Sequence, residues 1–131
     1  MKKGNIKGLA HIGIYAKDID VSIDFYKKLG FTLDKEATVP AVPPFRLAFL
    51  SAGTCLIELV ERPSEGRRSH GPVDHFAVEV DDIDAAVARA IGNGINIDAS
   101  TITSVDILGG VRNVFFEGPD GERIEFFQYG G

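Results

Sequence analysis

The sequence H-I-G-I-Y-A-K-D-I-D, residues 11–20, has a counterpart 64 positions later in H-F-A-V-E-V-D-D-I-D, residues 75–84. Gly30-Phe31 and Gly94-Ile95 are related by the same offset. Near the end of each copy, G-T-C-L-I-E at 53–58 corresponds to G-E-R-I-E at 121–125, with a slip of one residue. Internal similarity at one period indicates a supersecondary unit that occurs twice.

A polar stretch rich in turn-forming residues, 62–72, separates the two copies, which is typical of a connector. At 131 residues the chain is long enough for one hydrophobic core but not for two independent ones. We therefore predict a single domain, residues 1–131, made of two repeats at about 8–61 and 73–128.

The composition, 44% apolar and 25% charged, is that of a soluble globular protein. The formal charge is −5 and no basic cluster extends beyond Arg67-Arg68, so nucleic acid is not an expected partner. The sequence shows neither a long apolar run nor a signal peptide, so no membrane association is expected. The single cysteine, Cys55, cannot form an intrachain disulfide, which agrees with a cytoplasmic location.

Each copy is predicted to fold as βαβββ, beginning with an apolar, β-branched strand at 8–15 or 74–80. A helix follows, for which Asp20 or Asp84 is the expected N-cap. The buried helix positions are expected at Val21, Phe25 and Leu29 and at Val87, Ala88 and Ile91, with helix ends at Gly30 and 92–94. Further strands are expected at 32–37, 45–51, 54–61, 95–98, 112–117 and 122–128, with loops at 38–44 and 98–110. The predicted fold class is α+β, with two βαβββ modules forming a cupped mixed sheet and the helices outside.

Side chains alternate across a strand, so residue parity assigns them to faces. One face of the first and last strands of each copy is wholly apolar and is expected beneath the helices. The opposite face carries one ionisable group in each of these four strands: His11, Glu58, His75 and Glu125. If the two sheets curl towards one another, these groups converge in a half-apolar trough.

Two imidazoles and two carboxylates are a suitable ligand set for a divalent metal. A single strand histidine is most often satisfied or exposed, and a single strand glutamate usually points to solvent. Here the four occupy repeat-equivalent positions, which favours a metal site over unrelated surface residues. His70 is expected to be solvated and Cys55 to be a small core residue. Arg46, which shares a face with Ala48 and Leu50, lies either in the trough or at a sheet edge.

Two stretches, H-I-G-I-Y-A-K-D-I-D-V-S-I-D-F-Y-K-K-L-G-F at 11–31 and N-V-F-F-E-G-P-D-G-E-R-I-E-F-F-Q at 113–128, resemble the vicinal oxygen chelate superfamily. That family includes glyoxalase I, bleomycin-resistance proteins, extradiol dioxygenases, fosfomycin-resistance enzymes and methylmalonyl-CoA epimerase. The likeness covers residues 8–128 and implies paired βαβββ modules cupped around a metal. The four ionisable groups look like the ligand set of bacterial glyoxalase I, which implies Ni, Co or Zn.

The resemblance implies a lyase or isomerase of lactoylglutathione lyase type, acting on the hemithioacetal of a 2-oxoaldehyde with glutathione or another thiol. The metal would polarise two vicinal oxygens and stabilise an enediolate. A glutamate would move the proton between adjacent carbons, with Glu125 favoured as the base and Glu58 as its partner. Tyr15 and Arg62 replace an arginine and an asparagine of bacterial glyoxalase I, so the metal chemistry is better supported than the thiol.

Other functions within the resemblance stay open. An epimerase or thiol transferase would share the ligands, whereas a small-molecule-sequestering resistance protein would usually lack them. Dioxygenase chemistry is less favoured, because Glu58 would occupy a position that oxygen chemistry needs open on Fe(II). Related proteins often build the site across a homodimer, with His11 and Glu58 from one chain and His75 and Glu125 from the other. A homodimer is therefore expected.

Overall fold

The computed structural model describes residues 9, 11–61, 75–106 and 108–130, which form two four-stranded sheets and two α-helices. The first half of the chain contributes β1 (Ile12–Ala16), α1 (Ile19–Leu29), β2 (Thr32–Val39), β3 (Phe45–Ala52) and β4 (Cys55–Glu61). The second half contributes β5 (Phe76–Glu79), α2 (Ile83–Gly92), the 3-10 helix η1 (Ala99–Thr101), β6 (Thr103–Val105), β7 (Val111–Glu117) and β8 (Arg123–Tyr129). The expected connector, 62–72, lies outside the described residues.

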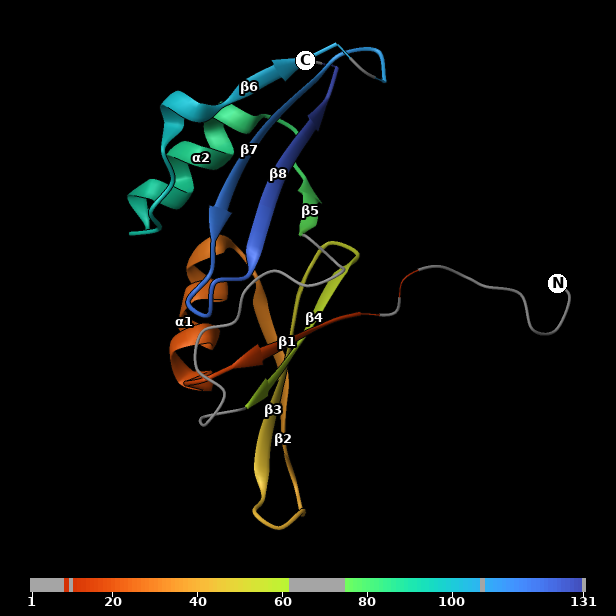
Figure 1. The fold of residues 1–131 in the computed structure, drawn as a ribbon, viewed down its shortest axis with the longest axis vertical. Helices are drawn as coiled ribbons and strands as arrows, with labels where there is room; N and C mark the ends of the chain where they lie inside the picture. The colour runs from red at the N-terminus through yellow and green to blue at the C-terminus, as the bar shows by residue number, and fades with distance from the viewer. Residues whose placement is uncertain (1–8, 10, 62–74, 107, 131) are drawn as a thin grey trace, which may run out of the picture.

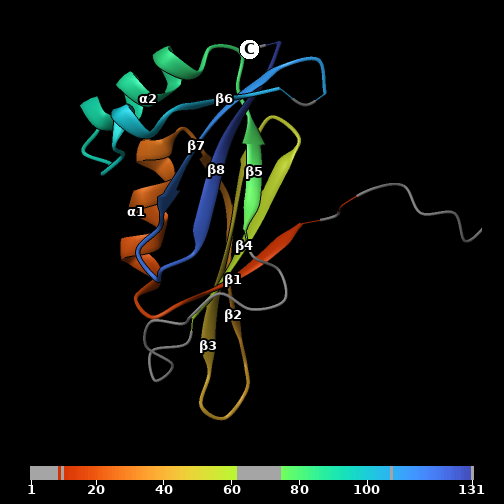
Figure 2. The ribbon, with the colours of Figure 1, turned by 45° about the horizontal axis from the view of Figure 1, so that its top comes forward.

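Both sheets have the same topology. The strand order is β1-β4-β3-β2 in the first sheet and β5-β8-β7-β6 in the second. In each sheet the opening strand pairs in parallel with the last strand, and the other pairs are antiparallel. The predicted α+β fold of two βαβββ modules is confirmed. The modules follow one another along the long axis, with α1 and α2 on the same side of the molecule (Figure 1), and the helices keep that side in the turned view (Figure 2).

The hydrophobic core lies between the helices and the sheet faces turned towards them, and it contains residues of both modules. The predicted face assignment holds, because Ile14, Ile57 and Ile124 are buried on this side of β1, β4 and β8. The large, fully buried side chains of the core are Tyr26, Ile19, Leu50, Ile57, Leu59, Ile83, Ile124, Val111 and Val114.

Both helices begin two residues earlier than predicted. The N-caps are Asp18 and Asp82, whose extended backbones let their side chains accept hydrogen bonds from first-turn amides. Asp20 and Asp84 lie inside the first turn, so their prediction as N-caps is wrong. The buried stripes are therefore Ile19, Ser22, Ile23 and Tyr26 in α1 and Ile83, Val87 and Ala90 in α2. Val21, Ala88 and Ile91, predicted as buried, are exposed.

The strand predicted at 95–98 does not form. Ile95 and Ile97 are buried in the core, so their alternation reflects burial without strand pairing. Asp98 accepts hydrogen bonds from the backbone N–H and the hydroxyl of Ser100, which starts η1 instead. The pairing strand is β6, which lies inside the predicted loop 98–110 and pairs with β7.

The two modules are joined where the turn between β7 and β8 meets α1. Asp120 accepts hydrogen bonds from the Lys17 backbone N–H at 2.9 Å and from the Ser22 hydroxyl at 3.2 Å. The Tyr26 hydroxyl donates to Glu122 Oε2 at 2.9 Å, and the Asp120 N–H donates to Glu122 Oε1 at 2.9 Å. These contacts tie the tip of the second module to the first helix through charge-assisted hydrogen bonds.

The Tyr26–Glu122 contact makes the stability of the junction depend on pH. Burial raises the pKa of Glu122 above its ordinary value, and the Tyr26 hydrogen bond opposes that rise. The Glu122 carboxyl therefore binds its proton more tightly in the folded protein than in the unfolded chain. The stabilisation of the fold that comes from this protonation is fully present at low pH and is lost as pH rises through the raised pKa. In Tyr26→Phe the ionised form loses its donor. We expect unfolding free energy to fall by about 1.5–3 kcal/mol near pH 8 and by about 0.5–1.5 kcal/mol near pH 4.

Denaturant unfolding at the two pH values measures this difference. Tyr129→Phe is the matched control, because Tyr129 is exposed and its loss of a hydroxyl should change stability by less than about 0.5 kcal/mol. If Tyr26→Phe lowered the free energy of unfolding equally at both pH values, the hydroxyl would not act through the charge of Glu122.

Candidate metal centre

His11 and Glu58 come together in the first module. His11 immediately precedes β1, and Glu58 lies beside Gly13 in the parallel β1–β4 pair. His11 Nε2 is 3.5 Å from Glu58 Oε1. A Cβ on Gly13 would contact the same carboxylate oxygen at 3.8 Å. Gly13 and Glu58 lie on the sheet face opposite the helices, which we call the site face.

His75 and Glu125 form the equivalent pair in the second module. His75 immediately precedes β5, and Glu125 lies in β8 beside Ala77. His75 Nε2 is 3.1 Å from Glu125 Oε1, and Asn113 Nδ2 donates to Glu125 Oε2 at 2.8 Å. Glu125 is only 6% exposed. One oxygen of this buried carboxylate thus faces an imidazole, and the other accepts from an amide.

A phenylalanine lies beside each glutamate on the site face. Phe49 in β3 is paired with Glu58, and Phe115 in β7 is paired with Glu125. The Phe115 and His75 rings meet edge to face with centroids 5.2 Å apart, and the Arg123 guanidinium lies 4.0 Å from the Phe115 centroid. The His75 imidazole is therefore oriented by packing as well as by Glu125.

An ion pair ties one sheet strand to the helix in each module. Arg46 in β3 donates to both carboxylate oxygens of Asp20, and Arg112 in β7 donates to both oxygens of Asp84, at 2.7–3.0 Å. These hydrogen bonds hold the pKa of Asp20 and of Asp84 below the ordinary value, because they favour the carboxylate form. Arg46 therefore points towards α1, and the alternative that placed it in the trough is wrong.

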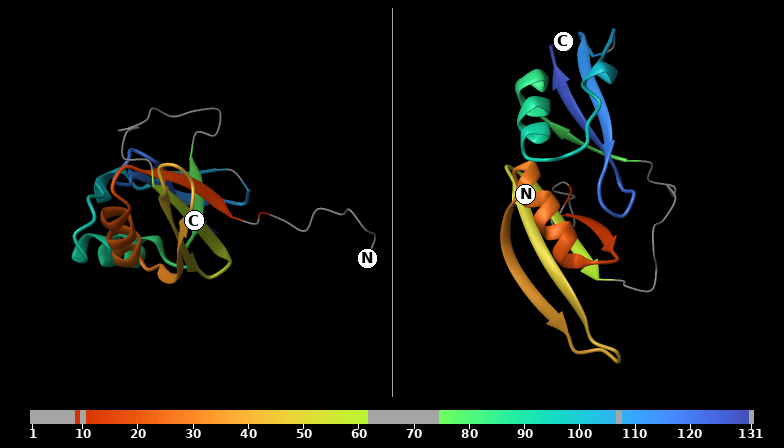
Figure 3. Two further views of the ribbon diagram at one scale, coloured as in Figure 1. Left: turned by 90° about the horizontal axis from the view of Figure 1, so that it is seen from below. Right: turned by 90° about the vertical axis from the view of Figure 1, so that its left-hand side faces the viewer.

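The structure brings the four predicted ligands together as two pairs and not as one cluster. Among the described residues, no group of three or more His, Cys, Asp or Glu side chains is placed to hold one ion. Each pair belongs to its own sheet, and the two modules lie end to end (Figure 3, right). Two residues considered from the sequence, Arg62 and His70, lie outside the described residues.

Each pair has the geometry of two neighbouring ligands on one metal ion. Histidine nitrogen and carboxylate oxygen bind zinc at about 2.0–2.2 Å, so two such atoms lie about 3.0 Å apart at a right angle and about 3.4 Å apart at a tetrahedral angle. The observed separations are 3.5 Å for His11–Glu58 and 3.1 Å for His75–Glu125. Imidazole nitrogen and carboxylate oxygen are donors that Zn, Ni and Co accept. The donor set therefore fits a divalent cation, with each pair as half of a site.

Sequence reasoning missed Asn113, Phe49 and Phe115. A signal for Phe115 was available, because the tight turn at 118–121 makes β7 and β8 a hairpin, and its register places Phe115 opposite Glu125. Asn113 is the neighbouring residue of β7 on the same face, two positions before Phe115, and it lies opposite Phe127. Its contact with Glu125 is diagonal, which a reading of strand faces alone does not reveal.

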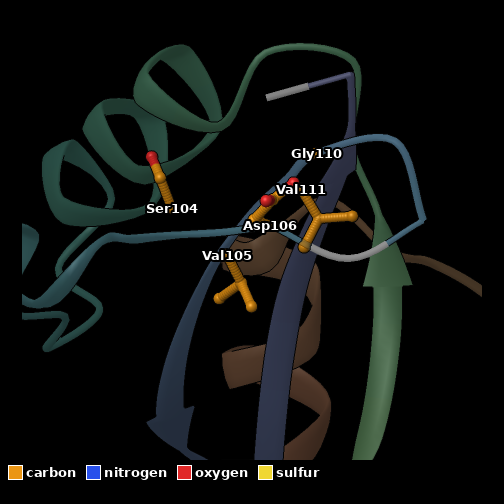
Figure 4. Close-up of a pocket in the computed structure, with 5 residues that line it drawn as sticks. All are labelled: Ser104, Val105, Asp106, Gly110 and Val111. Atoms are coloured by element: carbon orange, nitrogen blue, oxygen red, sulfur yellow. The ribbon is translucent and has the colours of Figure 1, made fainter.

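A pocket of about 320 Å³ lies away from both pairs, at the end of the second module. It is open and lined by Ser104, Val105, Asp106, Gly110 and Val111 (Figure 4). None of the four predicted ligands lines it. Across the described part of the chain, none of the helices has the length and apolar character to cross a membrane.

Two βαβββ modules, each with a histidine–glutamate pair on the face opposite its helix, define a protein of the vicinal oxygen chelate fold. The model of the Glyoxalase/Bleomycin resistance protein/Dioxygenase superfamily matches residues 8–126. The chain belongs to this superfamily.

The chain is also similar to a known bacterial protein and to solved structures. The chain is 36% identical over 126 residues to the uncharacterized protein YwbC of Bacillus subtilis, covering 93% of this chain and 98% of that protein. A glyoxalase family protein from Enterococcus faecalis has a similar structure, with a TM-score of 0.78, 25% identity, and coverage of 92% of this chain and 97% of that one. The fosfomycin resistance protein FosX from Listeria monocytogenes, solved with Mn(II) and sulfate, shares the fold at a TM-score of 0.71 and 16% identity, covering 95% of this chain and 93% of that one.

Proposed function

We propose that this protein is a metal-dependent lyase or isomerase of the glyoxalase I type, acting on the hemithioacetal of a 2-oxoaldehyde with glutathione or another thiol. The observation that carries the proposal is the pair of His–Glu contacts at 3.5 Å and 3.1 Å, at equivalent points of two repeated modules. The superfamily includes metalloenzymes that act on small molecules, which supports it. We place the activity in the cytoplasm.

The site is proposed to form between two copies of the chain. The two pairs of one chain do not meet, so four ligands on one ion require a second copy. His11 and Glu58 would come from one chain, and His75 and Glu125 from the other. A twofold homodimer would then contain two equal sites.

In this proposal, His11, Glu58, His75 and Glu125 would hold a Ni, Co or Zn ion, which would supply Lewis acidity to the substrate oxygens. Glu125 accepts the proton from the carbon that bears the thiol sulfur and returns it to the neighbouring carbon. The hydroxyl proton passes between the two oxygens, and the product is the thioester of a 2-hydroxy acid. No external oxidant or reductant is needed. Glu58 is the repeat-related partner carboxylate in this proton transfer.

Metal removal tests the proposed function. We expect the chelator-treated protein to lose thioester formation from methylglyoxal and glutathione, and addition of Ni, Co or Zn to restore it. Thioester absorbance follows the reaction, with metal content measured on the same samples. Full activity in the metal-free protein, or a metal-loaded protein inert towards every 2-oxoaldehyde–thiol adduct, would contradict the proposal.

Tyr15 favours a second candidate function. Its side chain belongs to the site face of β1 and is 44% exposed, at the point where the resemblance to bacterial glyoxalase I calls for an arginine that holds glutathione. A phenol does not provide the guanidinium group of an arginine. The second candidate is therefore an epimerase or thiol transferase that uses the same four ligands on a substrate other than a glutathione adduct.

A further inference from the structure

The two His–Glu pairs occupy equivalent points of the repeat but differ in their surroundings. The Glu125 side chain is 7% exposed and the Glu58 side chain is 22% exposed. Glu125 has a polar contact at each oxygen, from Asn113 Nδ2 at 2.8 Å and from His75 Nε2 at 3.1 Å. Among the described residues, Glu58 has such a contact only with His11, at the longer distance of 3.5 Å. Duplication of the fold therefore has not produced two identical half-sites.

One position on the strand next to each glutamate differs between the modules in its capacity to hydrogen-bond. Arg46 and Arg112 are equivalent, because each forms the two-pronged ion pair with the helix of its own module. The residue that follows each arginine points to the opposite face, the site face. That residue is Leu47 in the first module and Asn113 in the second.

The register of the strands makes Leu47 and Asn113 directly comparable. Leu47 is paired with Val60, two residues after Glu58, and Asn113 is paired with Phe127, two residues after Glu125. Each therefore lies diagonally across from its glutamate, within reach of a side-chain contact. Leucine has no donor to offer Glu58. The asparagine amide donates to Glu125 Oε2 at 2.8 Å.

We propose that Asn113 is a positioning residue that presets the Glu125 carboxylate for the metal, so that the second module carries the ordered half of the site. With Oε2 held by the amide, Oε1 is directed to the side of His75 Nε2, the other donor of the pair. Because a carboxylate already fixed in its bound orientation loses less freedom on binding, metal affinity should depend on Asn113. The inference rests on the metal site of the proposed function.

Asn113→Leu tests the inference with a substitution that the fold already accommodates at the equivalent point, Leu47. We expect the dissociation constant for Zn or Ni, measured by calorimetric titration of the metal-free full-length protein, to rise about 10–100-fold. Asn113→Gln, which keeps an amide donor, should stay within a few-fold of the unaltered protein. Far-UV circular dichroism spectra of the variants at the titration temperature should coincide, which shows that the fold is retained.

A second background separates positioning from a general effect on the fold. In Glu125→Ala, which leaves no side-chain oxygen for Asn113 to hold, three predicted ligands remain for zinc, and adding Asn113→Leu should change the dissociation constant by less than about twofold, because the contact acts through Glu125. In the Glu58→Gln background, Asn113→Leu should still raise the dissociation constant by about the same factor as in the unaltered protein. The inference would be overturned if Asn113→Leu raised the dissociation constant equally in both backgrounds, or if it did not raise the dissociation constant of the otherwise unaltered protein.

The outcomes also separate this inference from the proposed function. Protein that binds metal with the expected Asn113 dependence but converts no 2-oxoaldehyde adduct would overturn only the proposed reaction. Protein that converts the adduct and binds metal equally well with Asn113→Leu would overturn only the role of Asn113. Failure of the unaltered protein to bind Zn, Ni or Co would overturn both.

Discussion

In Glu125→Gln we expect kcat/KM for the 2-oxoaldehyde–thiol adduct to fall by about 10³-fold, within the range for loss of a positioned general base. That factor corresponds to about 4 kcal/mol of transition-state stabilisation. The glutamine amide can neither accept nor return the substrate proton. It nevertheless keeps a carbonyl oxygen in nearly the same place, so metal binding should remain measurable. The experiment is steady-state kinetics together with metal content of each preparation.

Two further variants make the assignment specific. Glu79→Gln is the matched control, because Glu79 is paired with Phe127 on the same face as Glu125 but is exposed and is not a predicted ligand. Its kcat/KM should stay within about twofold of the unaltered protein. Glu58→Gln should be less harmful than Glu125→Gln. The reverse order would transfer the role of base to Glu58, and an active Glu125→Gln protein would remove Glu125 from the reaction.

Mixing two inactive variants should restore activity if the site is shared between chains. One chain carries His11→Gln and Glu58→Gln, and the other carries His75→Gln and Glu125→Gln. After subunit exchange at equal amounts, half of the dimers are mixed and one of the two sites in each is intact, so about one quarter of full activity is expected. Each variant alone should be inactive.

The control for this experiment mixes the single variants His11→Gln and Glu58→Gln. Their defects lie in the same half-site, so every site in a mixed dimer contains one damaged ligand, and the activity of the mixture should not exceed the average of the two variants. Sedimentation of the unaltered protein establishes whether it is a dimer under the assay conditions. Recovery of no activity from the first mixture, with exchange shown by mass spectrometry, would contradict a site built from two chains.

Much of the fold followed from local patterns in the sequence. Both βαβββ modules could be predicted because strand alternation and helix periodicity are properties of neighbouring residues. The first helix was shifted because Asp20 and Asp18 are both good capping residues, and Ile19, between them, begins the buried stripe. At 95–98, the alternation of Ile95 and Ile97 satisfied the strand pattern, yet no strand pairs with that segment. Alternating apolar residues indicate which side chains are buried, but they do not indicate whether the segment pairs with another strand.

In the candidate site, too, some residues could be predicted from the sequence and others could not. His11, Glu58, His75 and Glu125 could be selected from repeat equivalence and parity, and the structure places them as two close pairs. Asn113 could not be selected, because its contact with Glu125 depends on the diagonal geometry between β7 and β8. Arg46 was misplaced as a possible trough residue because parity identifies a face only after one knows which face the helix covers. Its ion pair with Asp20 settles that question.

Spacing along short stretches of the chain was enough to predict the duplicated modules, the apolar face of the main strands and the four ionisable groups on the opposite face. The three-dimensional packing was needed to show that these groups meet as two separate pairs, that Glu125 is buried against Asn113, and that Tyr26 joins the modules through Glu122. These features depend on distances between segments far apart in the sequence, which strand registers and module packing set and local spacing does not encode.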